Sequence, residues 1–114
     1  MRYLLMIYTD EYEIALSPEE SGALLGEYGK FGEEMGRRGI LQGGARLRPV
    51  ADATSVRVRD GEVLISDGPF AETKEQIGGY YLVDCKDLDE ATEVAAKLPG
   101  ARQGTIEVRP IWEL

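Results

Sequence analysis

Two parts of the sequence repeat the order strand, helix, strand, and this repetition constrains the fold more than any other feature. The first part covers residues 2–47 and the second covers residues 79–112. Between them, residues 53–66 alternate apolar and polar side chains around Asp60-Gly61, which is a preferred two-residue hairpin turn. Two strand-helix-strand parts of this kind form an antiparallel sheet with both helices on one face. The sequence therefore predicts an α+β fold with an inserted β-hairpin.

The predicted strands of the main sheet have different characters. The first is almost continuously apolar, which is typical of a central strand that is covered on both faces. The second contains Gly43 and Gly44, which indicate a β-bulge or a close approach of backbone. The last contains Pro110, which cannot donate a ladder hydrogen bond, so we expect it at an edge or at a strand end. The four strands are Arg2–Thr9, Ile40–Leu47, Gly79–Cys85 and Thr105–Trp112.

Both predicted helices have clear start signals. Ser17, Pro18 and Glu20 form a capping box with proline at the first helical position. Asp87 and Glu90 mark the start of the second helix, and Pro99-Gly100 ends it. Apolar residues recur at helical spacing and predict the buried faces. These residues are Leu24, Tyr28, Phe31 and Met35 in the first helix, and Ala91, Val94, Ala95 and Leu98 in the second.

The first helix also carries a stripe of glycines, at positions 22, 26, 29, 32 and 36. Each glycine costs a helix about 1 kcal/mol relative to alanine, so the five together cost roughly 5 kcal/mol. Close packing of the helix on the sheet or on a partner chain would compensate for this cost. The alternative is that tertiary contacts elsewhere hold the helix and the glycines are merely tolerated.

The predicted sheet has helices on one face only, and its strands are apolar enough to require a cover on the other. A second copy of the same sheet is the simplest cover, so we expect a homodimer of ferredoxin-like subunits. A chain of 114 residues can bury roughly two-thirds of its unfolded surface, which favours one domain over residues 1–114.

Composition excludes several classes of function. The net charge is −8, and nucleic-acid binding depends on clustered Lys and Arg, so we expect no nucleic-acid partner. The chain has no His and a single Cys, Cys85, so we predict neither a disulfide nor a zinc site. A carboxylate-only Mg²⁺ or Ca²⁺ site stays open, but no acidic cluster has the spacing of a calcium loop, and we expect no metal and no cofactor. The apolar run Tyr3–Tyr8 is too short to span a membrane or to act as a signal segment. We therefore expect a cytoplasmic protein without membrane contact.

The segment Ser66–Tyr81 is the strongest candidate for a site. Asp67 can accept a hydrogen bond from its own turn, and Gly68-Pro69 makes that turn stiff, so the carboxylate would have a fixed direction. Phe70 is expected to bury its ring and hold the loop on the core. The alternative is an ordinary turn followed by a solvated charge run, Glu72–Glu75.

A longer stretch around this turn resembles a known family. DGPFAETKEQIGGYYLVDCKDLDEA, residues 67–91, is similar to the signature of the DGPF branch of the YCII-related family. MRYLLMIY at the start and GTIEVRPIWEL at the end resemble the outer strands of that family. The resemblance implies a ferredoxin-like subunit of the dimeric α+β barrel type, with a cleft near Asp67.

The resemblance also implies a range of functions. The wider family includes lyase-like enzymes that act on small aromatic compounds, and one branch uses a His paired with an Asp. Because this chain has no His, only Asp67 is carried over as a catalytic residue, with Glu72, Thr73 and Lys74 as neighbours for substrate binding. DGPF proteins also resemble partners that are encoded beside alternative sigma factors, which points to a stress or regulatory setting.

Two functions follow from these residues. The first is a cofactor-independent lyase or isomerase acting on a small aromatic or acidic molecule. Asp67 would accept a proton where burial disfavours its charged form, and Lys74 or the hydroxyl of Tyr80 would stabilise an oxyanion. Tyr80 and Tyr81 are adjacent on a strand, so only one of them can line a given pocket. The second is a ligand-binding or regulatory module without catalysis, and a purely structural dimer comes third.

Overall fold

The computed structural model describes residues 1–114 and has a mixed α+β fold. The strands are β1 (Arg2–Thr9), β2 (Leu41–Arg46), β3 (Thr54–Arg59), β4 (Glu62–Asp67), β5 (Gln76–Asp84) and β6 (Thr105–Pro110). The α-helices are α1 (Pro18–Arg37), α2 (Leu88–Ala96) and α3 (Gly100–Gln103). Two short 3-10 helices, η1 (Tyr12–Ala15) and η2 (Val50–Asp52), lie in the connections. The sequence did not predict α3, η1 or η2, because each is only one turn long and too short for a periodic pattern.

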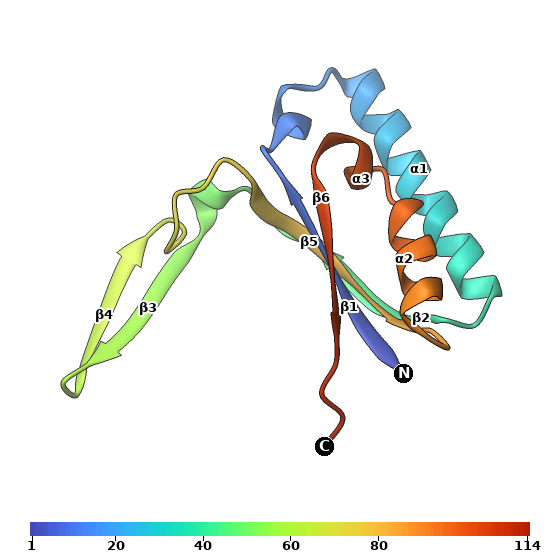
Figure 1. The fold of residues 1–114 in the computed structure, drawn as a ribbon. Coiled ribbons are helices and arrows are strands. Elements are labelled where there is room, and N and C mark those ends of the chain that lie inside the picture. The colour runs from blue at the N-terminus through green and yellow to red at the C-terminus, as the bar shows by residue number, and fades with distance from the viewer.

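The main sheet has the strand order β2-β5-β1-β6, and all of its neighbouring strands are antiparallel (Figure 1). The predicted central position of the first strand is confirmed, because β1 lies between β5 and β6. The predicted place of Pro110 is also confirmed, since it is the last residue of the edge strand β6. A register shift between Leu41 and Gly43 confirms the predicted bulge in β2.

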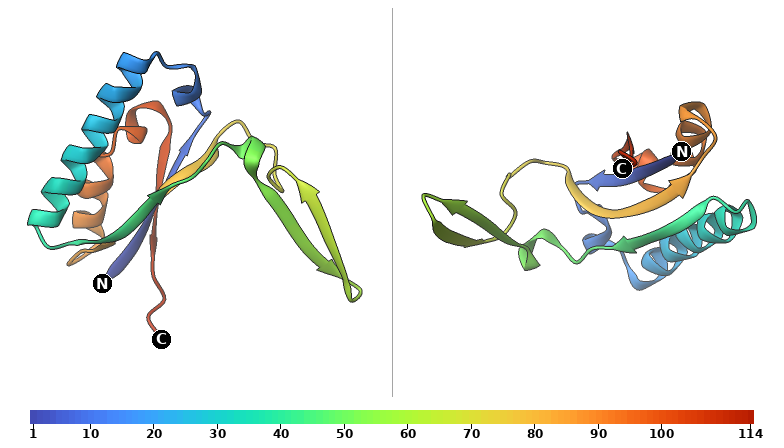
Figure 2. Two further views of the ribbon diagram at one scale, coloured as in Figure 1. Left: turned by 180° about the vertical axis from the view of Figure 1, so that it is seen from behind. Right: turned by 90° about the horizontal axis from the view of Figure 1, so that it is seen from below.

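The core lies between the sheet and the helices, which all stand on the same side of it (Figures 1 and 2). Alternate residues of β1 point into this core, and Leu5 at its centre is fully buried. Phe31 and Met35 of α1 are buried, and Leu24 and Tyr28 are partly buried, so the predicted apolar stripe is confirmed. The buried residues predicted for the second helix are also confirmed, and they are Ala91, Val94, Ala95 and Leu98.

Both predicted helix starts have the expected hydrogen bonds. The Ser17 hydroxyl accepts from the Glu20 backbone N–H at 3.1 Å, and the Glu20 carboxylate accepts from the Ser17 N–H at 3.0 Å. These bonds lower the pKa of the Glu20 carboxyl. The Asp87 carboxylate accepts from the Glu90 N–H at 2.9 Å. Local sequence alone therefore determines where α1 and α2 begin.

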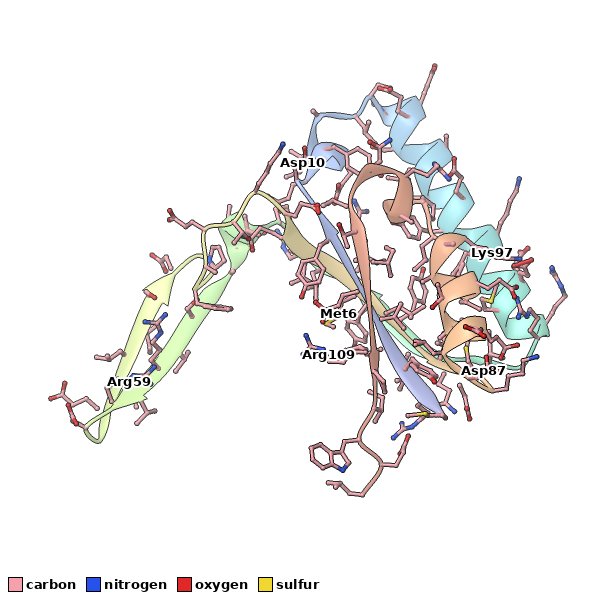
Figure 3. The ribbon with its side chains drawn as sticks, in the orientation of Figure 1. Met6, Asp10, Arg59, Asp87, Lys97 and Arg109 are labelled. Carbon is pink, nitrogen blue, oxygen red and sulfur yellow. The ribbon has the colours of Figure 1, made fainter.

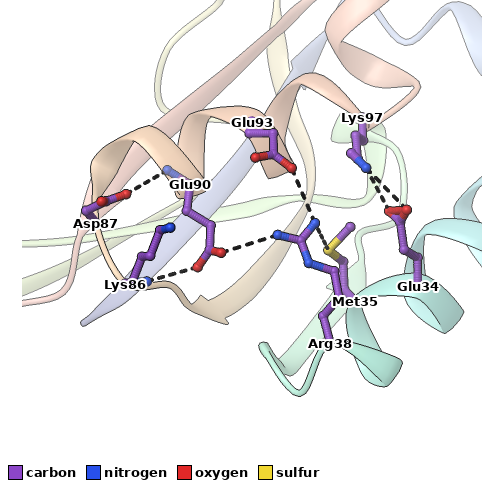
Figure 4. A network of polar contacts seen from close by, with 8 residues as sticks. All are labelled: Glu34, Met35, Arg38, Lys86, Asp87, Glu90, Glu93 and Lys97. Atoms are coloured by element: carbon purple, nitrogen blue, oxygen red, sulfur yellow. Dashed lines mark hydrogen bonds and ion pairs between the residues drawn. The ribbon is translucent and has the colours of Figure 1, made fainter.

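Charged residues hold the C-terminal end of α1 against α2 (Figure 4). Arg38, just after α1, pairs with Glu90 at 3.3 Å and with Glu93 at 3.5 Å. One helical turn earlier, Glu34 pairs with Lys97 at 3.2 Å. Exposed pairs of this kind contribute about 0–1 kcal/mol each, so they orient the two helices more than they stabilise the fold. The N-terminal half of α1 has no such connection to α2.

The glycine stripe of α1 does not pack on the sheet. A Cβ atom placed at any of its five glycines would have no neighbouring atom within 4 Å. Close packing within the chain is therefore wrong as an explanation, because the stripe faces away from the core. Packing on a partner chain stays a prediction.

We expect Gly29→Ala to raise the free energy of unfolding by about 0.5–1 kcal/mol, because alanine has less backbone freedom to lose in a helix. The added methyl group has free space around it. Urea denaturation of both proteins measures the difference. A lower stability for Gly29→Ala would instead indicate that a second chain packs on the stripe.

The strands β3 and β4 form a hairpin that projects away from the main sheet, on the side opposite to the helices (Figures 1 and 2). We refer to this hairpin, residues 54–67, as the arm. Its turn is confirmed as Asp60-Gly61, whose φ angles are 52° and 77°. Two positive φ angles are characteristic of the type I′ turn that matches the twist of paired strands.

Candidate functional site

A cleft of about 450 Å³ lies between the N-terminal half of α1 and the sheet. Its walls come from α1 and η1 on one side and from β1, β2 and β5 on the other. The ion pairs between α1 and α2 lie near the C-terminal end of α1, and Glu27 in the middle of α1 pairs with Arg102 of α3. Ser21, Leu24, Leu25 and Tyr28 line the helical wall.

Four of the ten strand residues that line the cleft are glycines. Gly43 and Gly44 of β2 and Gly78 and Gly79 of β5 all line it. At Gly44, a Cβ would lie 2.7 Å from the Tyr80 carbonyl oxygen, so only glycine permits this approach of the two strands. At Gly78, the nearest atom to a Cβ is Glu13 Oε1 at 3.7 Å, so a side chain would fit there and point into the cleft.

Three tyrosines line the cleft: Tyr12 of η1, Tyr28 of α1 and Tyr81 of β5. Burial raises the pKa of Tyr28 to about 12, and the neighbouring Tyr12 adds to this effect. Burial also raises the pKa of Tyr81 and, together with the nearby Glu13 carboxylate, that of Tyr12. A phenol is already protonated near neutral pH at its ordinary pKa, and these shifts act in the same direction, so each hydroxyl is available as a hydrogen-bond donor.

The cleft also has one cationic and one anionic side chain. Arg46, at the end of β2, is exposed and takes part in none of the ion pairs of the chain. Glu13 of η1 is partly buried, and its carboxylate accepts a long hydrogen bond, 3.5 Å, from the Thr9 hydroxyl. An unpaired guanidinium beside an apolar cleft is suited to a carboxylate of a bound molecule.

The residues predicted from the DGPF stretch lie elsewhere. Asp67 is the last residue of β4 and is exposed, and Glu72, Thr73 and Lys74 are exposed in the loop that leads to β5. None of these four residues lines the cleft. Thr73 is tied locally, because its hydroxyl donates to the Glu75 carbonyl at 2.7 Å.

The corner at Asp67 is stiff for a different reason from the predicted one. The expected bond from the Asp67 carboxylate to its own turn is not formed. Instead, the Gly68 N–H donates to the Ala53 carbonyl at 2.7 Å, and the Ser55 hydroxyl donates to the Gly68 carbonyl at 2.7 Å. The expectation that Phe70 is buried is also wrong, since 79% of it is exposed. The neighbouring β3 strand, rather than the core, holds this corner.

The two adjacent tyrosines of β5 point to opposite faces of the sheet, as expected for a strand. Tyr81 faces the helices and packs edge to face on Phe31, with ring centroids 4.9 Å apart. It also lines the cleft. Tyr80 pairs with Met6 on the other face, which the helices do not cover. Tyr81 is therefore the tyrosine of this pair that can contact a molecule in the cleft.

Sequence reasoning missed the cleft, although a signal was present. Two glycine pairs, Gly43-Gly44 and Gly78-Gly79, stand in two strands of the same sheet. Taken separately, they indicate a bulge and a strand entry. Only the pairing of β2 with β5 brings them to the same cleft, where they lie diagonally across the two strands, with Gly44 opposite Tyr81 and Gly79 opposite Arg46.

Comparison with known proteins is consistent with this architecture. The model of the YCII-related domain matches residues 1–114. An uncharacterized protein of Rhizobium meliloti (strain 1021) is 40% identical over 114 residues, which cover 97% of this chain and 92% of that protein. The chain therefore belongs to the YCII-related family.

Two further findings concern membrane spans and metal sites, neither of which was expected from the composition. None of the helices is both long enough and apolar enough to cross a membrane. Nowhere do three or more His, Cys, Asp or Glu side chains come together in a group that could hold a metal ion.

Proposed function

We propose that the protein binds a small, flat, largely apolar acid in the cleft between α1 and the sheet. The four glycines of the strand wall support this proposal most directly, because positions without side chains leave room in the cleft for a ring. Leu24, Leu25 and the tyrosine rings supply apolar contact from the other sides. Arg46 at the rim supplies the charge for a carboxylate. The ligand class is thus a small aromatic or acidic molecule.

We further propose a cofactor-independent lyase- or isomerase-like reaction on this ligand. Within the cleft, the Glu13 carboxylate is the group that could accept a proton, and the neutral hydroxyl of Tyr12 or Tyr81 could donate a hydrogen bond to a developing oxyanion. The motif acid Asp67, with Glu72, Thr73, Lys74 and Tyr80, is a second candidate region for this chemistry. In the single chain Asp67 is exposed, so it would need a cover before burial could favour its protonated form.

The alternative is a ligand-binding or regulatory module of a stress or sigma-factor system. The exposed Asp67 and the absence of a bond that orients its carboxylate favour this alternative over catalysis at the motif. The enzyme would be favoured if the parent protein turns over its ligand and Glu13→Gln still binds that ligand but does not turn it over. Binding without turnover would favour the module.

We also propose a cytoplasmic homodimer of ferredoxin-like subunits, of the dimeric α+β barrel type and the DGPF branch. The strand order β2-β5-β1-β6 with helices on one side supports the subunit type. The uncovered face of the sheet supports the dimer. Alternation along β1 and β5 places five apolar or aromatic side chains on that face. These are Leu4, Met6, Tyr8, Tyr80 and Leu82, which we call the open sheet face.

A thermal-shift screen against small aromatic carboxylic acids, phenols and lactones tests the cleft. A ligand at 100 times its dissociation constant adds about 2.7 kcal/mol of stability, which is readily measured. Gly78→Leu should remove the response, because its side chain would fill the cleft next to Glu13. Arg46→Gln should weaken the binding of carboxylic acids about tenfold and leave phenols unchanged.

Two further variants serve as controls for this screen. Gly32→Leu places the same side chain on the exposed face of α1, where a Cβ has no neighbour within 4 Å, and it should keep the full response. Asp67→Asn tests the second region, since asparagine is tolerated in the same backbone conformations. A response that survives in Gly78→Leu but disappears in Asp67→Asn would show that the motif, and not the cleft, is the site.

A further inference from the structure

The arm is unusual because it stands alone. Its strands β3 and β4 pair with each other and with no strand of the main sheet (Figure 1). A two-stranded hairpin by itself is at best marginally stable in water and needs a surface to pack on. In the single chain, the arm extends away from the helices and from the core.

One face of the arm is apolar and exposed. Val56 pairs with Ile65 and Val58 pairs with Val63, so these four side chains lie together on the same face. Their exposed fractions are 61% for Val56, 69% for Ile65, 58% for Val58 and 62% for Val63. We call them the apolar arm face. The opposite face is largely polar, with Ser55, Arg57, Arg59, Glu62, Leu64 and Ser66, and Figure 3 shows side chains on both sides of the hairpin.

We propose that the apolar arm face packs on a second copy of this chain, so that each subunit of the dimer holds its partner with its arm. This inference rests on the proposed dimer and names a further part of its interface. In a two-fold symmetric dimer, this contact would occur twice, once for each arm.

The surface area that a stable dimer must bury favours a second copy of this chain as the partner of the apolar arm face. Strand spacing and rise give the open sheet face of each chain roughly 400 Å², so two sheets in contact bury roughly 800 Å² in total. That area is only the size of a crystal-packing contact. The apolar face of a hairpin with six-residue strands covers roughly 200 Å². Two arms and the surfaces beneath them would raise the total to about 1,600 Å², the usual size of a specific interface.

The same contact would involve the motif acid. Asp67 pairs with Thr54, and alternation along β4 places it on the face of Val63 and Ile65. A second chain that covers the apolar arm face would therefore also reach Asp67. The exposed acid would then lie at the boundary between two subunits.

Matched substitutions on the two faces of β4 test the proposal. Ile65→Lys places a charge in the apolar arm face, and Leu64→Lys places the same charge on the opposite face, where Leu64 is 45% exposed. Sedimentation equilibrium should give twice the chain mass of 12.6 kDa for the parent and for Leu64→Lys. Ile65→Lys should raise the dissociation constant of the dimer at least 100-fold. Equal dissociation constants for the two variants would overturn the proposal, as would a parent of 12.6 kDa at all concentrations.

Hydrogen exchange provides the second measurement and controls for folding. In the parent, the amides of β3 and β4 should be protected at micromolar concentration and should lose protection on dilution. In Ile65→Lys, they should exchange rapidly while β1 and β5 stay protected, which shows that the subunit is folded. An arm that stays protected in monomeric Ile65→Lys would contradict the proposal. A failed ligand screen would count against the cleft alone. Neither the mass from sedimentation nor the hydrogen exchange of the arm amides depends on a bound ligand.

Discussion

Gly104→Ala is expected to destabilise the protein by about 3 kcal/mol, near the upper end for overpacked sites. Gly104 joins α3 to β6, where the chain passes directly over the end of β1. A Cβ at this position would overlap the carbonyl oxygen of Tyr8 and lie 3.0 Å from the Tyr8 carbonyl carbon. These atoms belong to the central strand and cannot move without breaking the pairing of Tyr8 with Ile77 and Thr105.

Thermal and urea denaturation measure this effect. A loss of about 3 kcal/mol corresponds to a decrease of the melting temperature of roughly 10 °C or more for a domain of this size. Gly22→Ala is the matched control, because a Cβ there has no neighbour within 4 Å and alanine favours the helix. Equal melting temperatures for the parent and Gly104→Ala would show that α3 can shift away from β1.

Leu5→Ala is expected to have an effect of similar size, a loss of about 3 kcal/mol, for the opposite reason. Leu5 is 0% exposed at the centre of β1, between Tyr81 and Val108 of the neighbouring strands. Its truncation removes buried apolar surface and leaves a cavity, and leucine-to-alanine changes of this kind cost about 2–5 kcal/mol.

The comparison with an exposed leucine isolates the contribution of burial. Leu88→Ala removes the same atoms at a site that is 54% exposed, at the first position of α2. Its effect should stay within about 0.5 kcal/mol. Urea denaturation should show a changed midpoint and an unchanged slope for Leu5→Ala. A loss below about 1 kcal/mol would mean that the helices collapse onto the vacant space.

The Gly104→Ala substitution also bears on the cleft, because α3 contacts the helix that forms one of its walls. Gly100, at the start of α3, is a position where a Cβ would lie 3.1 Å from the Tyr28 hydroxyl. A shift of α3 in Gly104→Ala would therefore reach the helical wall of the cleft. We expect the ligand response of this variant to weaken together with its stability, whereas Leu88→Ala should change neither.

Much of the fold was predictable because its signals are local. The capping box at Ser17 and Glu20 involves groups three residues apart, and the Asp60-Gly61 turn is specified by two residues. The buried stripe of α1 follows from helical periodicity alone. Such signals depend on interactions within one or two turns of chain, so they can be interpreted before the tertiary structure is known.

Other expectations concerned which side chains are covered by another part of the protein, and for these the sequence was ambiguous. The glycines of α1 were expected to allow close packing on the sheet or on a partner, and within the chain they face open space. Phe70 was expected to be buried because aromatic rings usually are, yet it is 79% exposed beside the base of the arm. Whether a residue is covered depends on segments far away in the sequence, and composition does not specify them.

The sequence by itself determined the strands, the two longer helices with their starting residues and buried faces, and the family of the chain, because each of these depends on residue order over short distances. Only the tertiary structure decided where a ligand could bind. The pairing of β2 with β5 brought two separate glycine pairs to one wall of the cleft, and α1 with η1 forms the opposite wall. A cleft is a space between elements, so it depends on long-range pairing and packing that no single stretch of the sequence encodes.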